Sequence, residues 1–250
     1  MLQKNELEKR PAATAGLLLR SVSLRRGSRQ VLQNLSLEMR EARIGLVGLN
    51  GSGKSSLARL LNGLLRADEG EVLVGGVDAA KEPKLAASRV GFLFQNPDHQ
   101  IIFPTVGEDI AFGLRQQGAA KEAARATALE ILREYRCEGW IDRPVSELSE
   151  GQKHLVCLLS VLVMQPDVLV LDEPFSSVDL AVRTHLMAVL GTLPLQVILI
   201  SHDLDVYDGF DRLIWLDGGG VKADGPPATV LPVYRKFALN KAADLAPQSL

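Results

Sequence analysis

The sequence has little cysteine and no long hydrophobic run. Its 250 residues include only 2 cysteines, Cys137 and Cys157, which lie far apart and form no CxxC pattern. This argues against a disulfide framework or a zinc site and favours a reducing compartment. The most apolar stretch, residues 155–164, is far shorter than the roughly 20 residues that a membrane-spanning helix needs. We therefore expect a chain that does not cross a membrane, although it can still dock on one.

The sequence also lacks a strong charge of either sign. Lys and Arg number 28 and Asp and Glu number 30, which gives a formal net charge of −2. A nucleic-acid-binding domain is usually strongly basic, so no nucleic-acid partner is expected. With 22 Gly and 12 Pro, the composition is not that of a disordered or collagen-like chain. The N-terminus is charged and has no apolar core of a signal peptide, so the sequence predicts a cytosolic location.

The order of apolar and polar segments predicts an α/β fold with three parts. Residues 1–16 show no periodicity and are expected to form a mobile tail. Short apolar runs at 17–19, 31–37 and 71–77 predict a small antiparallel β region. Residues 97–150 are rich in helix formers and predict a helical insertion.

The rest of the chain alternates strands with helices. Strands are predicted at 43–47, 168–171 and 197–200, and helices after residue 53, from 149, and near 180–191. This alternation predicts a mostly parallel sheet covered on both faces. A final hairpin is predicted at 213–216, with its turn at 218–220, and a polar C-terminal tail is expected at 236–250.

The first motif with chemistry is a phosphate-binding loop. Residues 48–55 read G-L-N-G-S-G-K-S, between a predicted strand and an amphipathic helix. Glycines in this pattern let backbone N–H groups surround a phosphate chain, while the lysine neutralises its charge and the serine holds Mg²⁺. The alternative is an ordinary glycine-rich turn. The predicted ATP and Mg²⁺ site comprises Gly48, Leu49, Asn50, Gly51, Ser52, Gly53, Lys54, Ser55 and Ser56.

The second motif, V-L-V-L-D-E-P at 168–174, places two carboxylates at the carboxyl end of an apolar strand. Ligands bind at that edge of a parallel sheet. Asp172 is predicted to hold Mg²⁺ through its water, and Glu173 to orient or deprotonate the water that attacks the γ-phosphorus. A solvated acidic turn is the alternative.

The third motif is L-S-E-G-Q at 148–152, followed by an apolar helix. Ser149 and Gln152 fit a capping box, so a plain helix start is the alternative. Together these motifs resemble the ATP-binding subunits of ABC transporters, whose signature is usually LSGGQ. The resemblance runs from about residue 17 to 230 and implies a P-loop NTPase (RecA-like) domain over 17–235, with a mostly parallel sheet, an antiparallel β subdomain and a helical insertion. It also implies that Ser149, Gly151 and Gln152 meet the γ-phosphate held by a second copy.

The resemblance assigns further residues by position. Gln95 corresponds to the Q-loop residue that reaches Mg²⁺ and the attacking water. Ser177, Val178 and Asp179 correspond to the D-loop, and His202 corresponds to the switch histidine, following what is predicted to be the last parallel strand. Lys54, Gln95, Glu173 and His202 are thus the predicted catalytic set. One departure is Arg26, which stands where the family usually stacks an aromatic ring on adenine; a guanidinium can also stack on a base.

Residues 94–114 favour one branch of that family. They are similar to the ATPases of energy-coupling factor transporters, bacterial importers of vitamins and transition-metal ions. That similarity implies a second ATPase subunit, with a homodimer expected, and a substrate-capture membrane protein. It also implies a membrane coupling protein that docks near 97–106. The consecutive Ile101, Ile102 and Phe103 fit such a surface, with a local core strand as the alternative.

The expected location is then the cytoplasmic face of the bacterial inner membrane, as a peripheral subunit. Dedicated transporters of this type import biotin, cobalt or nickel, and this chain is most similar to the biotin group. The alternatives are a cobalt or nickel importer ATPase, or a soluble ABC-type ATPase without a transporter. The latter usually has two cassettes or a coiled-coil insert, and this chain has neither.

Overall fold

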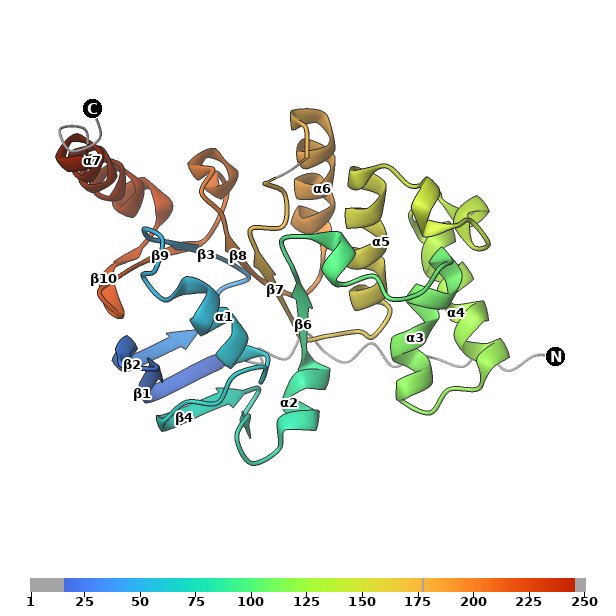
Figure 1. Ribbon diagram of the computed structural model, residues 1–250, viewed down its shortest axis with the longest axis horizontal. Coiled ribbons are helices and arrows are strands. Elements are labelled where there is room, and N and C mark those ends of the chain that lie inside the picture. Colours follow the sequence, from blue (N-terminus) through green and yellow to red (C-terminus); the bar gives the residue numbers. More distant parts are fainter. Residues whose placement is uncertain (1–15, 177, 246–250) are drawn as a thin grey trace.

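The computed structural model describes residues 16–176 and 178–245. Residues 1–15 of the tail expected at 1–16, residues 246–250 of the tail expected at 236–250, and the D-loop residue Ser177 lie outside these residues. A six-stranded sheet runs through the centre (Figure 1). Its strands, in spatial order, are β10 (Gly220–Gly225), β9 (Arg212–Asp217), β3 (Arg43–Val47), β8 (Gln196–Ile200), β7 (Val168–Asp172) and β6 (Val90–Leu93). All neighbours are parallel except β9 and β10.

Both faces of the sheet are covered, which explains why its strands are continuously apolar. Side chains alternate between the faces along each strand. On β8, Ile198 and Ile200 join a core with α1 (Lys54–Leu61) and the antiparallel sheet. Val197 and Leu199 face the opposite core, which includes residues of α5 (Glu150–Leu162), α6 (Leu180–Thr192) and α7 (Pro227–Leu245).

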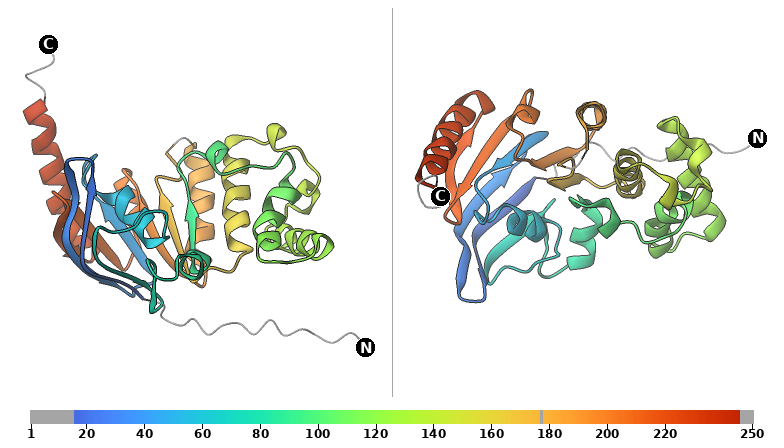
Figure 2. Two further views of the ribbon diagram at one scale, coloured as in Figure 1. Left: turned by 60° about the horizontal axis from the view of Figure 1, so that its bottom comes forward. Right: turned by 45° about the horizontal axis from the view of Figure 1, so that its top comes forward.

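A separate antiparallel sheet lies beside α1 (Figures 1 and 2). Its order is β2 (Arg29–Met39), β1 (Leu17–Arg26), β4 (Glu69–Val74) and β5 (Val77–Asp78). The prediction of a small antiparallel region is therefore confirmed. Strands β1 and β2 are longer than the apolar runs at 17–19 and 31–37, and the run at 71–77 divides between β4 and β5. The fold class predicted from the sequence is confirmed as well.

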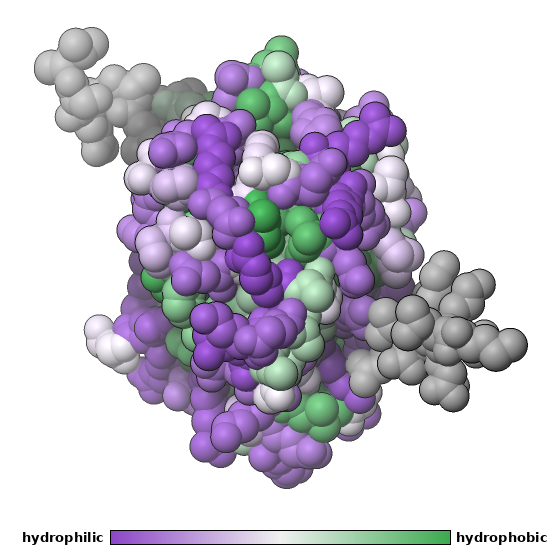
Figure 3. All heavy atoms as spheres, turned by 90° about the vertical axis from the view of Figure 1, so that its right-hand side faces the viewer, coloured by the Kyte–Doolittle hydropathy of each residue, from purple (hydrophilic) through white to green (hydrophobic). Residues whose placement is uncertain are grey.

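The helical region forms a lobe at the far side of β6 (Figure 2). It contains α3 (Val106–Gln116) and α4 (Lys121–Glu134), together with the short 3-10 turns η1 (Pro97–His99), η2 (Glu138–Trp140) and η3 (Val145–Glu147). Its core also takes Val156 and Leu159 from α5, so α5 joins the lobe to the sheet. Figure 3 views the lobe from outside and shows a mostly hydrophilic surface with small hydrophobic areas.

Three features differ from the sequence-based expectation. The helix α2 (Pro83–Arg89) and the edge strand β6 were not predicted, because both are short. The strand β9 also runs parallel to β3, so β8 is not the last parallel strand. The hairpin between β9 and β10 was predicted, and its turn residues Gly218 and Gly219 both have positive φ, as a type I′ turn requires.

The expected polar tail from 236 is the third difference, because α7 continues to Leu245. The helix is held by an aromatic cluster in which Trp215 of β9 lies 5.5 Å from Tyr234 and 4.8 Å from Phe237, between ring centroids. Pro232 inside the helix and the exposed hydrophobic residues Val233 and Leu239 hid the helical pattern in the sequence. Among the described residues, no helix is long and apolar enough to cross a membrane.

Candidate nucleotide site

The loop between β3 and α1 has the backbone that a phosphate chain requires. Gly48 and Gly53 have φ of 153° and 105°, which side chains rarely adopt. A Cβ atom on Gly48 would lie 2.3 Å from the carbonyl oxygen of Leu216, and one on Gly53 would lie 2.8 Å from the Leu32 side chain. Both positions therefore require glycine. The loop leads directly into the N-terminus of α1, where backbone N–H groups and the helix dipole favour a bound anion.

Lys54 is buried at the start of α1, with 7% of its surface exposed. Its ammonium donates to the carbonyl oxygens of Gly48, at 2.7 Å, and Leu49, at 3.2 Å. Burial lowers the pKa of Lys54, and the nearby carboxylates of Glu173 and Asp172 partly oppose that shift. The positive charge is thus held inside the loop, next to the acidic end of β7.

Ser55, which follows Lys54, and Asp172 bring two side-chain oxygen atoms together. The Ser55 hydroxyl donates to Oδ1 of Asp172 at 3.0 Å. Hydroxyl and carboxylate oxygens are hard ligands of the kind that Mg²⁺ prefers, and Mg²⁺ is usually held by one or two carboxylates together with substrate phosphates. The pair fits Mg²⁺ in that manner. A cluster of three or more His, Cys, Asp or Glu side chains able to hold a metal is absent from the described residues.

Glu173 follows in a left-handed backbone conformation, with φ of 54°. Its N–H donates to the Ile200 carbonyl at 3.0 Å. Its Oε2 accepts from the N–H of His202 at 3.2 Å, and its Oε1 lies 3.4 Å from the His202 ring. Burial raises the pKa of Glu173, while His202 and Lys54 partly oppose that shift. A strained, mostly buried carboxylate with a raised pKa at a sheet edge is a candidate general base.

The predicted signature begins α5. Ser149 and Gln152 form the capping box: the Ser149 N–H donates to Oε1 of Gln152 at 3.0 Å, and the Gln152 N–H donates to the Ser149 hydroxyl at 3.3 Å. The plain helix start and the anion site are therefore compatible. Figure 1 shows α5 and α1 on opposite sides of β6, so the signature is not near the loop of its own chain.

Comparison with known proteins decides the family. The family model described as "ABC transporter" matches residues 32–176. The chain is 48% identical to the biotin transport ATP-binding protein BioM of Rhodobacter capsulatus, over 85% of this chain and 91% of the relative. It is 35% identical to the energy-coupling factor transporter ATP-binding protein EcfA1 of Bacillus subtilis, over 85% and 76%. This chain belongs to the ABC transporter ATPase family.

A solved structure agrees with this assignment. The ABC ATPase superposes on cbiO1 of Clostridium perfringens, described as part of the ABC transporter complex cbiONQ, with a TM-score of 0.77. The sequence identity is 27%, and the superposition covers 89% of this chain and 94% of that one. The predicted identity of an ABC-type ATPase, similar to the energy-coupling factor type, is confirmed, and so is ATP as its nucleotide.

The ABC ATPase brings most predicted site residues together. A hydrogen bond joins Ser55 to Asp172, and another joins His202 to Glu173. Both carboxylates also act electrostatically on Lys54. Gln95 follows β6, and its amide donates to the Ser176 hydroxyl at 3.2 Å, on the chain that leaves β7.

Of three other predicted positions, Asp179 and Arg26 lie outside this cluster and Ser56 adjoins it. Asp179 caps α6 by accepting from the Val182 N–H at 2.9 Å. Arg26 is exposed at the end of β1, in the hairpin that precedes the loop. Ser56 is half-buried on α1, next to Ser55.

Several groups that surround the site were not predicted from the sequence. The guanidinium of Arg29 donates to the Gly51 carbonyl at 3.0 Å, directly on the loop. Tyr234 of α7 approaches the Gly48 backbone, which partly opposes the rise in pKa that burial gives this tyrosine. Tyr207 lies under the end of β3. No local motif marks these residues, because each reaches the ATPase site from a segment distant in sequence.

Proposed function

We propose that this ABC ATPase powers an importer of the energy-coupling factor type and that its cargo is biotin. The observation that carries the proposal is the 48% identity to a biotin transport ATP-binding protein across nearly the full length of both chains. The relative named for the energy-coupling factor transporter supports the type. On this proposal the ATPase sits at the cytoplasmic face of the bacterial inner membrane as a peripheral subunit.

The site residues divide the reaction between them. Lys54 and the backbone N–H groups of 48–55 bind the phosphates, and Ser55, Asp172 and Gln95 would hold Mg²⁺. When bound, Mg²⁺ would neutralise charge that develops on the phosphate oxygens. Glu173 accepts the proton of the attacking water, and its raised pKa suits that role. His202, adjacent to Glu173, binds the γ-phosphate.

A second copy would complete each site. Ser149, Gly151 and Gln152 begin α5, which lies on the other side of β6 from α1 and its loop (Figure 1). The N-terminus of α5 can instead bind a γ-phosphate held by another chain. ATP then joins two copies, and hydrolysis releases them. This cycle would supply the mechanical step of import.

The structure of residues 97–106 supports the proposal that this segment docks to a partner at the membrane. Its three apolar residues do not form the alternative core strand: Ile102 is 61% exposed, while Phe103 packs on Phe112 with ring centroids 5.1 Å apart. Buried Asp109 holds the segment by accepting from the N–H groups of Ile102, at 2.9 Å, and Phe103, at 3.3 Å. A rigid base with an exposed isoleucine fits docking to a membrane coupling protein.

Purification from the native host tests the proposal. The tagged chain would be extracted from membranes, with its partners and any small molecule released on denaturation identified by mass spectrometry. We expect two small membrane proteins, biotin, and uptake of labelled biotin that a Lys54→Ala variant loses although it still assembles. Recovery of cobalt or nickel would contradict the assignment of biotin as the cargo. Recovery only of soluble, ribosomal or DNA-bound partners would contradict the proposed importer function.

A further inference from the structure

Among the residues that the structure describes, Tyr207 is the largest fully buried side chain, and its hydroxyl bonds to the strand that leads into the phosphate-binding loop. It belongs to the 3-10 turn η4 (Leu204–Tyr207), which follows the His202 segment. Its ring fills the place where Gly45 of β3 has no side chain: a Cβ atom on Gly45 would lie 2.5 Å from the ring. Phe210 packs against the ring edge-on, with centroids 5.4 Å apart. The ring is therefore fixed against β3.

The hydroxyl of Tyr207 has more acceptors around it than it has protons. It accepts from the Ser201 N–H at 2.7 Å. Its single proton faces three carbonyl oxygens, those of Leu46 and Ser201 at 3.1 Å each and that of Leu199 at 3.4 Å. A phenol donates to one partner at a time. Burial raises the pKa of Tyr207 well above its ordinary value, so the hydroxyl keeps this proton.

The three segments that meet at this hydroxyl all lead to the site. Leu46 lies two residues before Gly48, at the entrance of the phosphate-binding loop. Ser201 directly precedes His202, whose N–H donates to the Glu173 carboxylate. Leu199 lies on β8, the strand between β3 and β7. The hydroxyl thus ties the phosphate-binding strand to the segment that holds Glu173.

We propose that Tyr207 is a positioning residue for ATP hydrolysis, whose hydroxyl holds the Ser201–His202 segment in register with the phosphate-binding strand. The inference rests on the proposed role of His202. It assigns Tyr207 no contact with the nucleotide. The O–H bond of Tyr207 can point to the carbonyl of Leu46 or to that of Ser201 while the ring stays in place, so the hydroxyl bonds to both segments.

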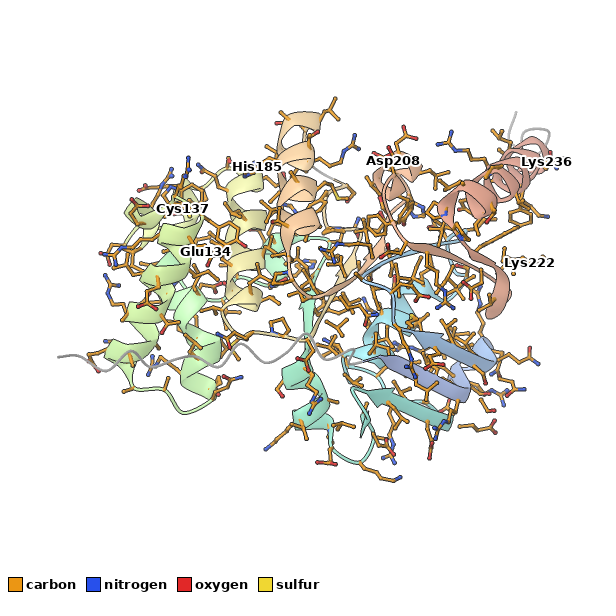
Figure 4. All side chains as sticks on the ribbon, turned by 180° about the vertical axis from the view of Figure 1, so that it is seen from behind. Glu134, Cys137, His185, Asp208, Lys222 and Lys236 are labelled. Carbon is orange, nitrogen blue, oxygen red and sulfur yellow. The ribbon has the colours of Figure 1, made fainter. Side chains whose placement is uncertain are left out.

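Two hollows and two ion pairs lie around η4. Hollows of about 460 Å³ and 600 Å³ flank η4, one toward α6 and one toward α7. Figure 4 shows Asp208 between these helices, with His185 on α6 and Lys236 on α7. At the surface, two ion pairs connect η4 and the residue before it to the neighbouring helices. Arg183 of α6 pairs with Asp203, and Arg235 of α7 pairs with Asp205 at 2.7 Å. Inside, Tyr207 is the anchor to β3.

The test is Tyr207→Phe in the purified full-length chain, because this change keeps the ring and removes only the hydroxyl. We expect kcat for ATP to fall at least five-fold while KM changes less than two-fold and nucleotide-binding stoichiometry stays the same. Hydrogen exchange at the amides of residues 201 and 202 should become faster. Tyr135→Phe, which removes a tyrosine hydroxyl from the helical lobe, is the matched control and should change none of these values.

A second background separates this inference from the proposed function. With His202→Ala, which should itself lower kcat, adding Tyr207→Phe should change kcat by less than two-fold, because the two residues act through one segment. Equal losses in both backgrounds, or an unchanged kcat in Tyr207→Phe alone, would overturn the positioning role. If His202→Ala leaves kcat unchanged, the proposed role of His202 fails, while faster exchange at 201 and 202 still supports the tie.

Discussion

Glu173 carries two costs that point to function: a left-handed backbone and a mostly buried carboxylate. Because burial raises its pKa in the folded state, the stability linked to protonation is present below the unfolded pKa and lost as pH rises through the higher folded value. Glu173→Gln keeps the shape but stays neutral. We expect the variant to melt at a higher temperature than the native chain at pH 7.5. The gain should shrink toward pH 4, which thermal unfolding monitored by circular dichroism would measure; an equal gain at both values would refute the charge explanation.

Arg26 gives a prediction about the base of the nucleotide. The residue is exposed at the end of β1, and its hairpin neighbour Arg29 already contacts the loop at Gly51. A flat aromatic ring stacks on adenine more favourably than a hydrated guanidinium, by about 1 kcal/mol. A difference of about 1.4 kcal/mol changes an equilibrium constant tenfold, so about 1 kcal/mol changes it roughly five-fold. Arg26→Tyr should therefore tighten ATP binding roughly five-fold.

Arg25→Tyr is the matched control, because successive side chains on a strand point to opposite faces. Titration with a fluorescent ATP analogue would measure both variants. Equal effects at 25 and 26 would place the adenine elsewhere.

Among the helices, α6 depends on a single arginine of β3. The guanidinium of Arg43 donates to five carbonyl oxygens: those of Ala42, Leu190, Gly191, Leu193 and Leu195. Leu190 and Gly191 belong to the last turn of α6, whose unpaired carbonyls favour a cation. The carbonyls of Leu190 and Ala42 also accept from backbone N–H groups, so Arg43→Met costs mainly the bonds to Gly191, Leu193 and Leu195. It should lower the free energy of unfolding by about 2–4 kcal/mol.

Arg43→Lys restores the charge without the planar fork and should recover only part of that loss. Arg40 is exposed in the connection between β2 and β3, three residues before Arg43. Arg40→Met should change the free energy of unfolding by less than about 1 kcal/mol. Urea denaturation would compare the three variants. A loss at position 40 equal to that at position 43 would contradict the capping account.

The segment at 97–106, proposed to dock to the membrane coupling protein, is held by Asp109 of α3. Asp109, 6% exposed, accepts from the backbone of Ile102 and Phe103 and from the Ser160 hydroxyl of α5, at 3.1 Å. Asp109→Ala should loosen the segment and reduce recovery of the membrane coupling protein at least five-fold in a pull-down, with ATP binding retained. Glu108→Ala, at the exposed neighbouring position, should recover it normally. Loss of coupling in both variants would argue that α3 itself, and not the held segment, is the binding element.

Across the entire chain, what could be predicted depended on whether the cause was local. The phosphate-binding loop, Asp172 and Glu173 were predictable, because each motif is a short run at the end of an apolar strand. The parallel sheet followed from the alternation of elements. The helix α7 was missed because its contacts, Trp215 with Tyr234 and Phe237, come from a distant strand.

The same reason explains the missed contacts of the site. Tyr207 meets Leu46 across 161 positions and Arg43 meets Leu195 across 152, so no periodicity in either segment reveals them. The side-chain direction of Arg29 is likewise set by the loop that it contacts. Packing of this kind is decided by the assembled fold.

We propose that ATP joins two copies of this chain and that hydrolysis, with Glu173 as the base, separates them. The most direct measurement is the mass in solution of Glu173→Gln by light scattering, with and without Mg²⁺ and ATP, beside its rate of phosphate release. We predict a monomer without nucleotide, a dimer with ATP, and a hydrolysis rate at least 100-fold below the native chain. A variant that binds ATP yet stays monomeric, or one that hydrolyses at the native rate, would contradict the account.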